Sequence, residues 1–137
     1  MFQILLIVLL AIHVVPGVFW AGSTFVLARQ EGQGAEQLTY PQIGAATVSI
    51  IAGLALWGIL HGGAFGRFQQ ILAVGVVCAI AAAGIQSARG LPAVRKLLAG
   101  QGDAASLRAQ IAAAQRIAAM LLVVTVISMV IARYVYF

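Results

Sequence analysis

The chain opens with a run that contains no Asp, Glu, Lys or Arg, MFQILLIVLLAIHVVPGVFWAGSTFVLA (Met1–Ala28). A helix needs about 20 mostly apolar residues to cross the hydrocarbon core of a bilayer, and this run exceeds that length. No basic segment precedes it, and it is longer than the apolar part of a signal peptide, so we expect a retained helix. The run therefore predicts an integral membrane protein.

Two more stretches, 37–66 and 68–88, are free of formal charge, and a fourth apolar stretch at about 111–131 is interrupted by Arg116. With 63% hydrophobic and 8% charged residues, the chain has too little polar surface to cover a water-soluble domain. We therefore predict an all-α fold, a polytopic four-transmembrane-helix bundle. It is expected to form one integral membrane domain, residues 1–137, with helices at about 2–28, 41–61, 67–88 and 111–133.

Basic side chains are unevenly distributed over the predicted loops. The first and third loops and the adjoining helix end carry Arg29, Arg89, Arg95, Lys96, Arg108 and Arg116, and the opposite side carries Arg67 and Arg133. The positive-inside rule then predicts a multi-pass protein of the cell inner (plasma) membrane with both termini outside. Anionic lipid accounts for the net charge of +5, so the expected partner is the bilayer and no nucleic acid is required. The amphipathic piece Pro92–Ala99 is expected to lie as a short helix in the membrane interface.

Two helices carry similar stripes of small, aromatic and histidine residues. In the first, His13, Gly17 and Trp20 recur at helical spacing, and in the second Ser49, Gly53, Trp57 and His61 recur every four residues. The glycines are expected to leave room for a flat ligand, and the tryptophans to wall it. Pro16 has no N–H for the carbonyl of Ile12, which predicts a bend and a free acceptor near His13.

An ionisable side chain in hydrocarbon indicates a functional site, and a buried imidazole must find a partner. His13 lies 16 residues from Arg29, and His61 lies 20 residues from Pro41, so the two levels differ by about 6 Å at a rise of about 1.5 Å per residue. One metal ion or one haem could meet both imidazoles. The alternatives are a hydrogen-bonded core residue for His13 and a water-facing helix end for His61. Met120 and Met129 are further soft ligands for copper or haem, although packing is the commoner role of methionine.

Several chemistries lack the residues that they need. The predicted spans contain no Asp, Glu or Lys for a proton relay, and the sequence has no Cys-x-x-Cys, no glycine-rich nucleotide loop and no nucleophile beside a base. Catalytic residues are therefore not assigned, and if the chain is an enzyme, an oxidoreductase is expected.

The first helix resembles that of the HemJ-type protoporphyrinogen oxidases and of the related CopD-type copper-resistance membrane domains. The residues that carry the likeness are Ala11–Leu27, AIHVVPGVFWAGSTFVL, in which a histidine is followed after six residues by a tryptophan and small residues. The likeness continues more faintly at Gly53–Trp57 and at Gln115–Arg116. The resemblance implies that His13 binds haem b. Where the HemJ type has a lysine, this chain has Gln69–Gln70; where it has an acidic residue, this chain has Arg116; and where it has a histidine late in the third helix, Gln86 lies nearby.

These departures favour a haem-type site over oxidation of protoporphyrinogen itself, and two function classes stay open. The first is a redox or haem- and metal-handling protein that holds haem b, or alternatively copper, with His13 and His61 as metal ligands and Gly17, Trp20, Gly53 and Trp57 as walls. The second is a non-catalytic accessory subunit of a larger membrane complex, or a self-associating homo-oligomer, in which His13 is a core residue.

Overall fold

The computed structural model describes residues 1–135 of the chain. Within them all regular secondary structure is helical, and four helical segments are long and apolar enough to span a membrane, which confirms the predicted all-α, four-helix membrane bundle. The elements are α1 (Phe2–Arg29), α2 (Ala35–His61), α3 (Arg67–Ile85), the π-helical turn η1 (Gln86–Gly90), α4 (Leu91–Leu98) and α5 (Ala104–Ala132).

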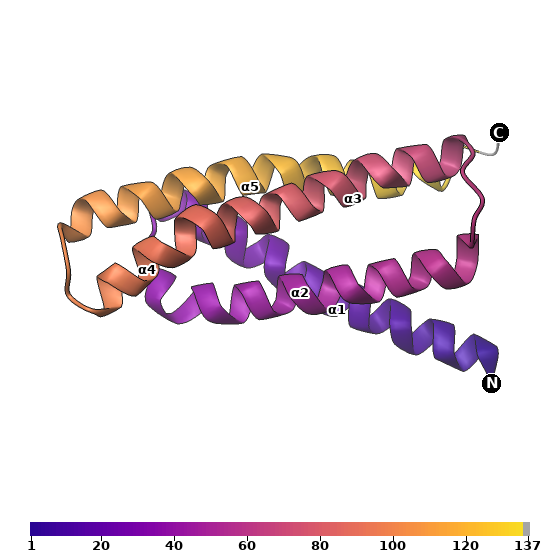
Figure 1. The fold of residues 1–137 in the computed structure, drawn as a ribbon, viewed down its shortest axis with the longest axis horizontal. Helices are drawn as coiled ribbons and strands as arrows, with labels where there is room; N and C mark the ends of the chain where they lie inside the picture. Colours follow the sequence, from indigo (N-terminus) through magenta and orange to yellow (C-terminus); the bar gives the residue numbers. More distant parts are fainter. Residues whose placement is uncertain (136–137) are drawn as a thin grey trace.

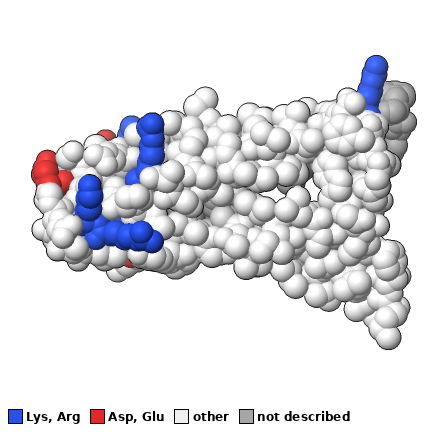
Figure 2. Space-filling model, viewed as in Figure 1, with Lys and Arg blue, Asp and Glu red and all other residues white. Residues whose placement is uncertain are grey.

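The helices pack as two antiparallel pairs, α1 with α2 and α3 with α5 (Figure 1). Both chain ends and the α2–α3 connection lie at one end of the bundle, called the terminal end below. The opposite end carries α4 and the α1–α2 and α4–α5 connections. Most Lys and Arg side chains gather there, so it is called the basic end (Figure 2).

At the basic end, four of the helices share one apolar core. Its buried side chains come from α1, α2, α4 and α5 and include Leu27, Ala35, Val94, Leu107 and Ile111. Toward the terminal end, α1 diverges from the other helices (Figure 1), and most side chains of its first four turns are exposed. Pro16 lies inside this continuous helix. Because proline has no backbone N–H to donate, one helical hydrogen bond is missing there, which favours a bend.

The predicted start of the second helix at residue 41 is wrong: α2 begins at Ala35, and Pro41 lies inside it. The connection that precedes α2 is held by α5. Arg108 forms an ion pair with Glu36 and donates to the carbonyl oxygen of Gly32 at 3.1 Å. Gly32 has φ +81°, and a Cβ there would lie 2.7 Å from the Arg108 carbonyl oxygen, so only glycine fits. These tertiary contacts stabilise a helical turn that the sequence around a proline disfavours.

The predicted short helix at Pro92–Ala99 is present as α4, but it is not a separate element. α4 continues from α3 through η1, so Arg67–Leu98 forms one long helical segment with a single π-helical turn (Figure 1). Ala93 and Val94 of α4 are buried against the core of the bundle, and the location of α4 in the membrane interface stays a prediction. α5 begins at Ala104, earlier than the predicted 111, because the Asp103 side chain caps it by accepting from the Ser106 N–H at 3.3 Å.

Candidate cofactor cavity between the helix pairs

The two helix pairs enclose a cavity of about 480 Å³ toward the terminal end, which we call the inter-pair cavity. Its volume lies within the range of roughly 300–1,000 Å³ that is common for small-molecule sites. The lining is almost wholly apolar and comes from α1, α2, α3 and α5. All six residues that the sequence singled out line this cavity: His13, Gly17, Trp20, Gly53, Trp57 and His61.

The stripes of α1 and α2 meet through a reciprocal pair of contacts between His13 and Ser49. The Nδ1 atom of His13 lies 2.7 Å from the carbonyl oxygen of Ser49, and the Ser49 hydroxyl donates to the carbonyl oxygen of His13 at 2.8 Å. The side chain of each residue thus hydrogen-bonds to the backbone carbonyl of the other, and this fixes both side chains. The hydroxyl binds the carbonyl of His13, whereas the acceptor predicted to be free beside Pro16 is that of Ile12.

This contact also fixes the tautomer of His13. A carbonyl oxygen can only accept a hydrogen bond, so Nδ1 carries the proton and donates. In the neutral ring, Nε2 then has a free lone pair. A histidine that donates through one nitrogen to a backbone carbonyl and offers the other is arranged as metal-binding histidines usually are.

The glycines serve a different purpose from the one expected. A Cβ at Gly53 would lie 2.7 Å from Cε1 of His13, and one at Gly17 would lie 3.0 Å from Oγ of Ser49. The volume that these residues omit is filled by the His13 ring and by the Ser49 side chain. The glycines therefore let α1 and α2 approach closely and seat the histidine, rather than leaving space for a flat ligand.

His61, at the terminal end of the cavity, is held in the opposite tautomer. Oε1 of Gln69 accepts from the backbone N–H of Gly66 at 2.9 Å, which identifies the other amide atom, Nε2, as the donor that lies 3.0 Å from Nδ1 of His61. Nδ1 is thus an acceptor, and in the neutral ring Nε2 carries the proton. The ring also packs against Phe68 at a centroid distance of 4.9 Å. To bind a metal through Nε2, His61 would have to change tautomer and give up Gln69.

The tryptophans take different positions in the cavity. Trp57 meets His61 edge to face at a centroid distance of 5.8 Å, near the terminal end. Trp20 is buried, with 4% of its surface exposed, and lies at the other end of the cavity. Its indole N–H donates to Oε1 of Gln86 at 2.8 Å. Trp20 therefore forms a floor that is hydrogen-bonded to η1.

Below this floor, three buried glutamines join α2, η1 and α5. Gln42 and Gln115 exchange two amide hydrogen bonds of 3.0 and 3.1 Å, and Nε2 of Gln86 donates to Oε1 of Gln115 at 2.9 Å. Gln42 and Gln86 also donate to the Thr24 hydroxyl, which in turn donates to the carbonyl oxygen of Trp20. We call Trp20, Ser23, Thr24, Gln42, Gln86 and Gln115 the amide network.

The donor-only indole of Trp20 sets the direction of the whole network. Because this N–H must meet an oxygen, the Gln86 amide has one orientation, and its Nε2 then orients Gln115 and, through it, Gln42. The chain of bonds returns to the carbonyl oxygen of Trp20 through Thr24. Such a closed set has one arrangement, and it fixes the position of the cavity floor.

The sequence analysis placed Ser49 on the stripe of the second helix but assigned no role in the site to Ser49, to Gln69 or to the three glutamines. Gln42 lies seven residues before Ser49 on the same stripe of α2, within the predicted helix. A simple signal was present, since polar side chains in an apolar span face the bundle interior and seek one another. Their pairing depends on which helices are neighbours, and the sequence alone does not show this.

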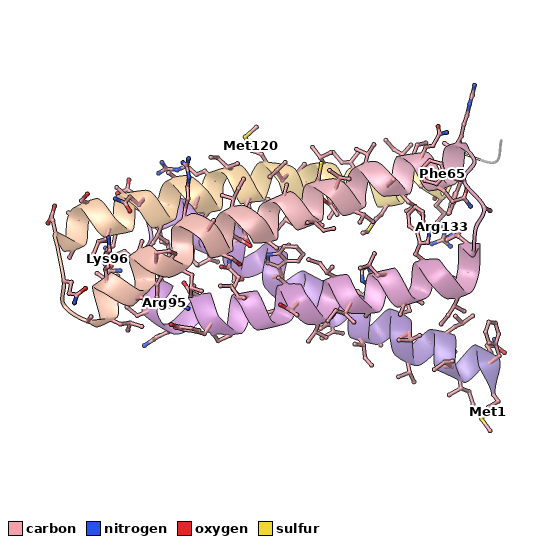
Figure 3. The ribbon with its side chains drawn as sticks, in the orientation of Figure 1. Met1, Phe65, Arg95, Lys96, Met120 and Arg133 are labelled. Carbon is pink, nitrogen blue, oxygen red and sulfur yellow. The ribbon has the colours of Figure 1, made fainter. Side chains whose placement is uncertain are left out.

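The two methionines considered as soft ligands differ in position. Met129 lines the inter-pair cavity, whereas Met120 is 74% exposed and points away from the bundle (Figure 3). Among residues 1–135, no group of three or more His, Cys, Asp or Glu side chains is placed to hold a metal ion. A metal in the cavity would therefore depend on histidine and sulfur ligands or arrive within a larger group.

No protein-family model, no curated protein and no solved structure matches this chain. What the structure establishes is an integral membrane bundle of four helices with an apolar cavity between its two pairs.

Proposed function

We propose that this membrane protein holds haem b in the inter-pair cavity, with Nε2 of His13 as an axial ligand. The observation that carries the proposal is the hydrogen bond from His13 Nδ1 to the Ser49 carbonyl, which leaves Nε2 as a lone-pair donor on a cavity-lining residue. The first helix also resembles that of the HemJ and CopD types. In the HemJ type, the histidine that matches His13 binds haem b.

The residues present fit such a group. Haem needs apolar walls and a nitrogen ligand of defined tautomer, and the cavity offers both. When bound, haem would supply one-electron redox chemistry. The chain's own contribution would be to bind and orient the ligand through His13 and Ser49 and to exclude water with apolar walls.

The test is the absorption spectrum of protein purified from cells that are well supplied with haem. The wild type should show a Soret band, and His13→Ala should lose it. His61→Ala should shift the band or leave it intact, because His61 is engaged by Gln69 and its Nε2 carries the proton. A colourless wild type contradicts the proposal.

Copper is the second candidate, and it rests on one observation: Met129 lines the same cavity as His13 and His61, so two imidazoles and one soft thioether border one space. Metal analysis of the haem-free protein distinguishes this case. If neither haem nor copper binds, the accessory-subunit interpretation takes precedence, and His13 is a core residue that pairs with Ser49.

We further propose that both termini face the exterior of the cell inner membrane. The support is the concentration of cations at the basic end, where Arg95 and Lys96 are exposed (Figure 3). A reporter fused after the last residue should be active only outside the cytoplasm. Activity confined to the cytoplasm would reverse the orientation.

A further inference from the structure

The inter-pair cavity is closed at both of its ends along the membrane normal. At the terminal end, Gln69 joins His61 to Gly66, and Phe68 packs on the imidazole. Toward the basic end, Trp20 is hydrogen-bonded to Gln86 above the amide network. Neither aqueous surface therefore offers an open path along the bundle axis.

The sides of the cavity, unlike its two ends, are bordered by few contacts between the helix pairs. The His61–Gln69 bond is the one hydrogen bond that directly joins α2 to α3 within residues 1–135. Figure 2 shows the molecule hollowed between the two helix pairs on the face in view. Six side chains line the cavity and are also exposed, and all are aliphatic: Leu10, Val14 and Val18 of α1, Leu54 and Leu60 of α2, and Val126 of α5. The cavity thus has a lateral rim that is compatible with acyl chains and not with water.

The height of the cavity places this rim within the hydrocarbon. Trp20 lies nine residues from the end of α1 at Arg29, or about 13 Å above it at a rise of about 1.5 Å per residue. The cavity extends from there toward the terminal end, across a core that is about 30 Å thick. A lateral opening at this height meets lipid tails.

We propose that the inter-pair cavity is loaded from the bilayer, through the lateral gaps between the two helix pairs, and that its ligand is an apolar molecule dissolved in the membrane. For haem as that ligand, this inference rests on the proposed function above. The route itself does not, because the closed ends and the aliphatic rim are independent of what the cavity holds.

Trp20 is a suitable probe, since it is almost fully buried and yet lines the cavity. In the Trp57→Phe variant it is the sole tryptophan of the chain. We expect its emission to be lost in vesicles of phosphatidylcholine with brominated acyl chains and retained in unbrominated vesicles. Iodide, added to the water on both sides, should have no effect. Quenching by iodide, or no quenching by brominated lipid, would overturn the proposal.

A pair of neighbouring valines on α3 supplies the matched control. Val76 lines the cavity, whereas Val77 is 65% exposed and does not line it. Val76→Phe should restore the emission of Trp20 in brominated vesicles, and Val77→Phe should not. Leu54→Phe and Ile51→Phe form the same comparison on α2, in case one variant fails to fold. Equal quenching in the plugged and control variants of both pairs contradicts lateral entry between the helix pairs.

The same variants separate this proposal from the haem proposal. When haem is supplied in donor vesicles, Val76→Phe should slow its uptake and Val77→Phe should leave the rate unchanged. If the wild type takes up no haem while brominated lipid still reaches Trp20, the haem proposal fails and the lateral route stands. If haem binds at the same rate in all variants, the route fails and the haem site stands.

Discussion

The polar side chains are arranged differently in the two halves of this bundle. Toward the basic end, the amide network joins all four membrane helices, with Gln42, Gln86 and Gln115 almost fully buried and mutually hydrogen-bonded. Toward the terminal end, the helix pairs separate around a cavity, and its polar contacts between helices are His13–Ser49, His61–Gln69 and the bond from the Thr125 hydroxyl to the Gly75 carbonyl. In hydrocarbon, hydrogen bonds and close packing rather than hydrophobic burial hold helices together. One half is therefore held in a single arrangement by buried hydrogen bonds, and the other surrounds a cavity.

Removing the central glutamine should have the largest effect on stability. Gln115→Leu leaves Oε1 of Gln42 and one amide N–H of Gln86 without partners in a buried site, whereas Nε2 of Gln42 keeps its bonds to Ser23 and Thr24. We expect the bundle to lose about 2–3 kcal/mol of stability. Thermal unfolding in detergent measures this loss as a lower Tm. The control is Gln110→Leu, an exposed glutamine on the same helix, and an equal loss in both variants contradicts a central role for the network.

The next effect concerns the seat of His13. Gly53→Ala places a Cβ 2.7 Å from Cε1 of the imidazole, so the ring or the helix must move. Overpacking of this kind costs about 1–3 kcal/mol. It should also weaken any absorption band that depends on His13, although no ligand atom is removed. Gly58→Ala, on the same helix and with no atom within 4 Å, should leave both Tm and spectrum unchanged.

A smaller effect is expected at the terminal end. Gln69→Ala removes the hydrogen bond to Nδ1 of His61 and the cap on the Gly66 N–H, but these groups are near water and can find other partners. We expect a loss of about 1 kcal/mol or less. The Tm of Gln69→Ala should therefore lie between those of the wild type and Gln115→Leu. A loss as large as that of Gln115→Leu would mean that both halves contribute equally.

Much of the fold and part of the candidate site could be predicted from the sequence, and the features that could not be predicted have physical reasons. Three charge-free runs and a fourth apolar run interrupted by Arg116 predicted the four helices, and helical spacing placed His13 and Gly53 on stripes that the structure brings together. The start of α2 was missed because it depends on Arg108, which lies far along the chain. The tautomer of His61 depends on Gln69 across a turn, and no periodicity reveals that contact. Whether the cavity holds a cofactor stays a prediction.

The smallest effect on stability is expected from the isosteric substitution Thr→Val, compared at two buried threonines. Thr24 accepts from Gln42 and Gln86 and donates to the Trp20 carbonyl, whereas the hydroxyl of Thr39, 1% exposed, has no hydrogen-bond partner among the described residues. Burying an unpaired hydroxyl is unfavourable, so Thr39→Val should leave Tm unchanged or raise stability by up to about 1 kcal/mol.

The same substitution at Thr24 should act in the opposite direction, with a loss of about 1–3 kcal/mol, because it leaves one amide N–H of Gln86 unpaired and removes one of the three acceptors around Nε2 of Gln42. Unfolding of both variants in one detergent gives the sign of each change directly. If Thr39→Val is the more damaging of the two, its hydroxyl has a partner such as a buried water, and the polar interior extends further toward the basic end than the amide network.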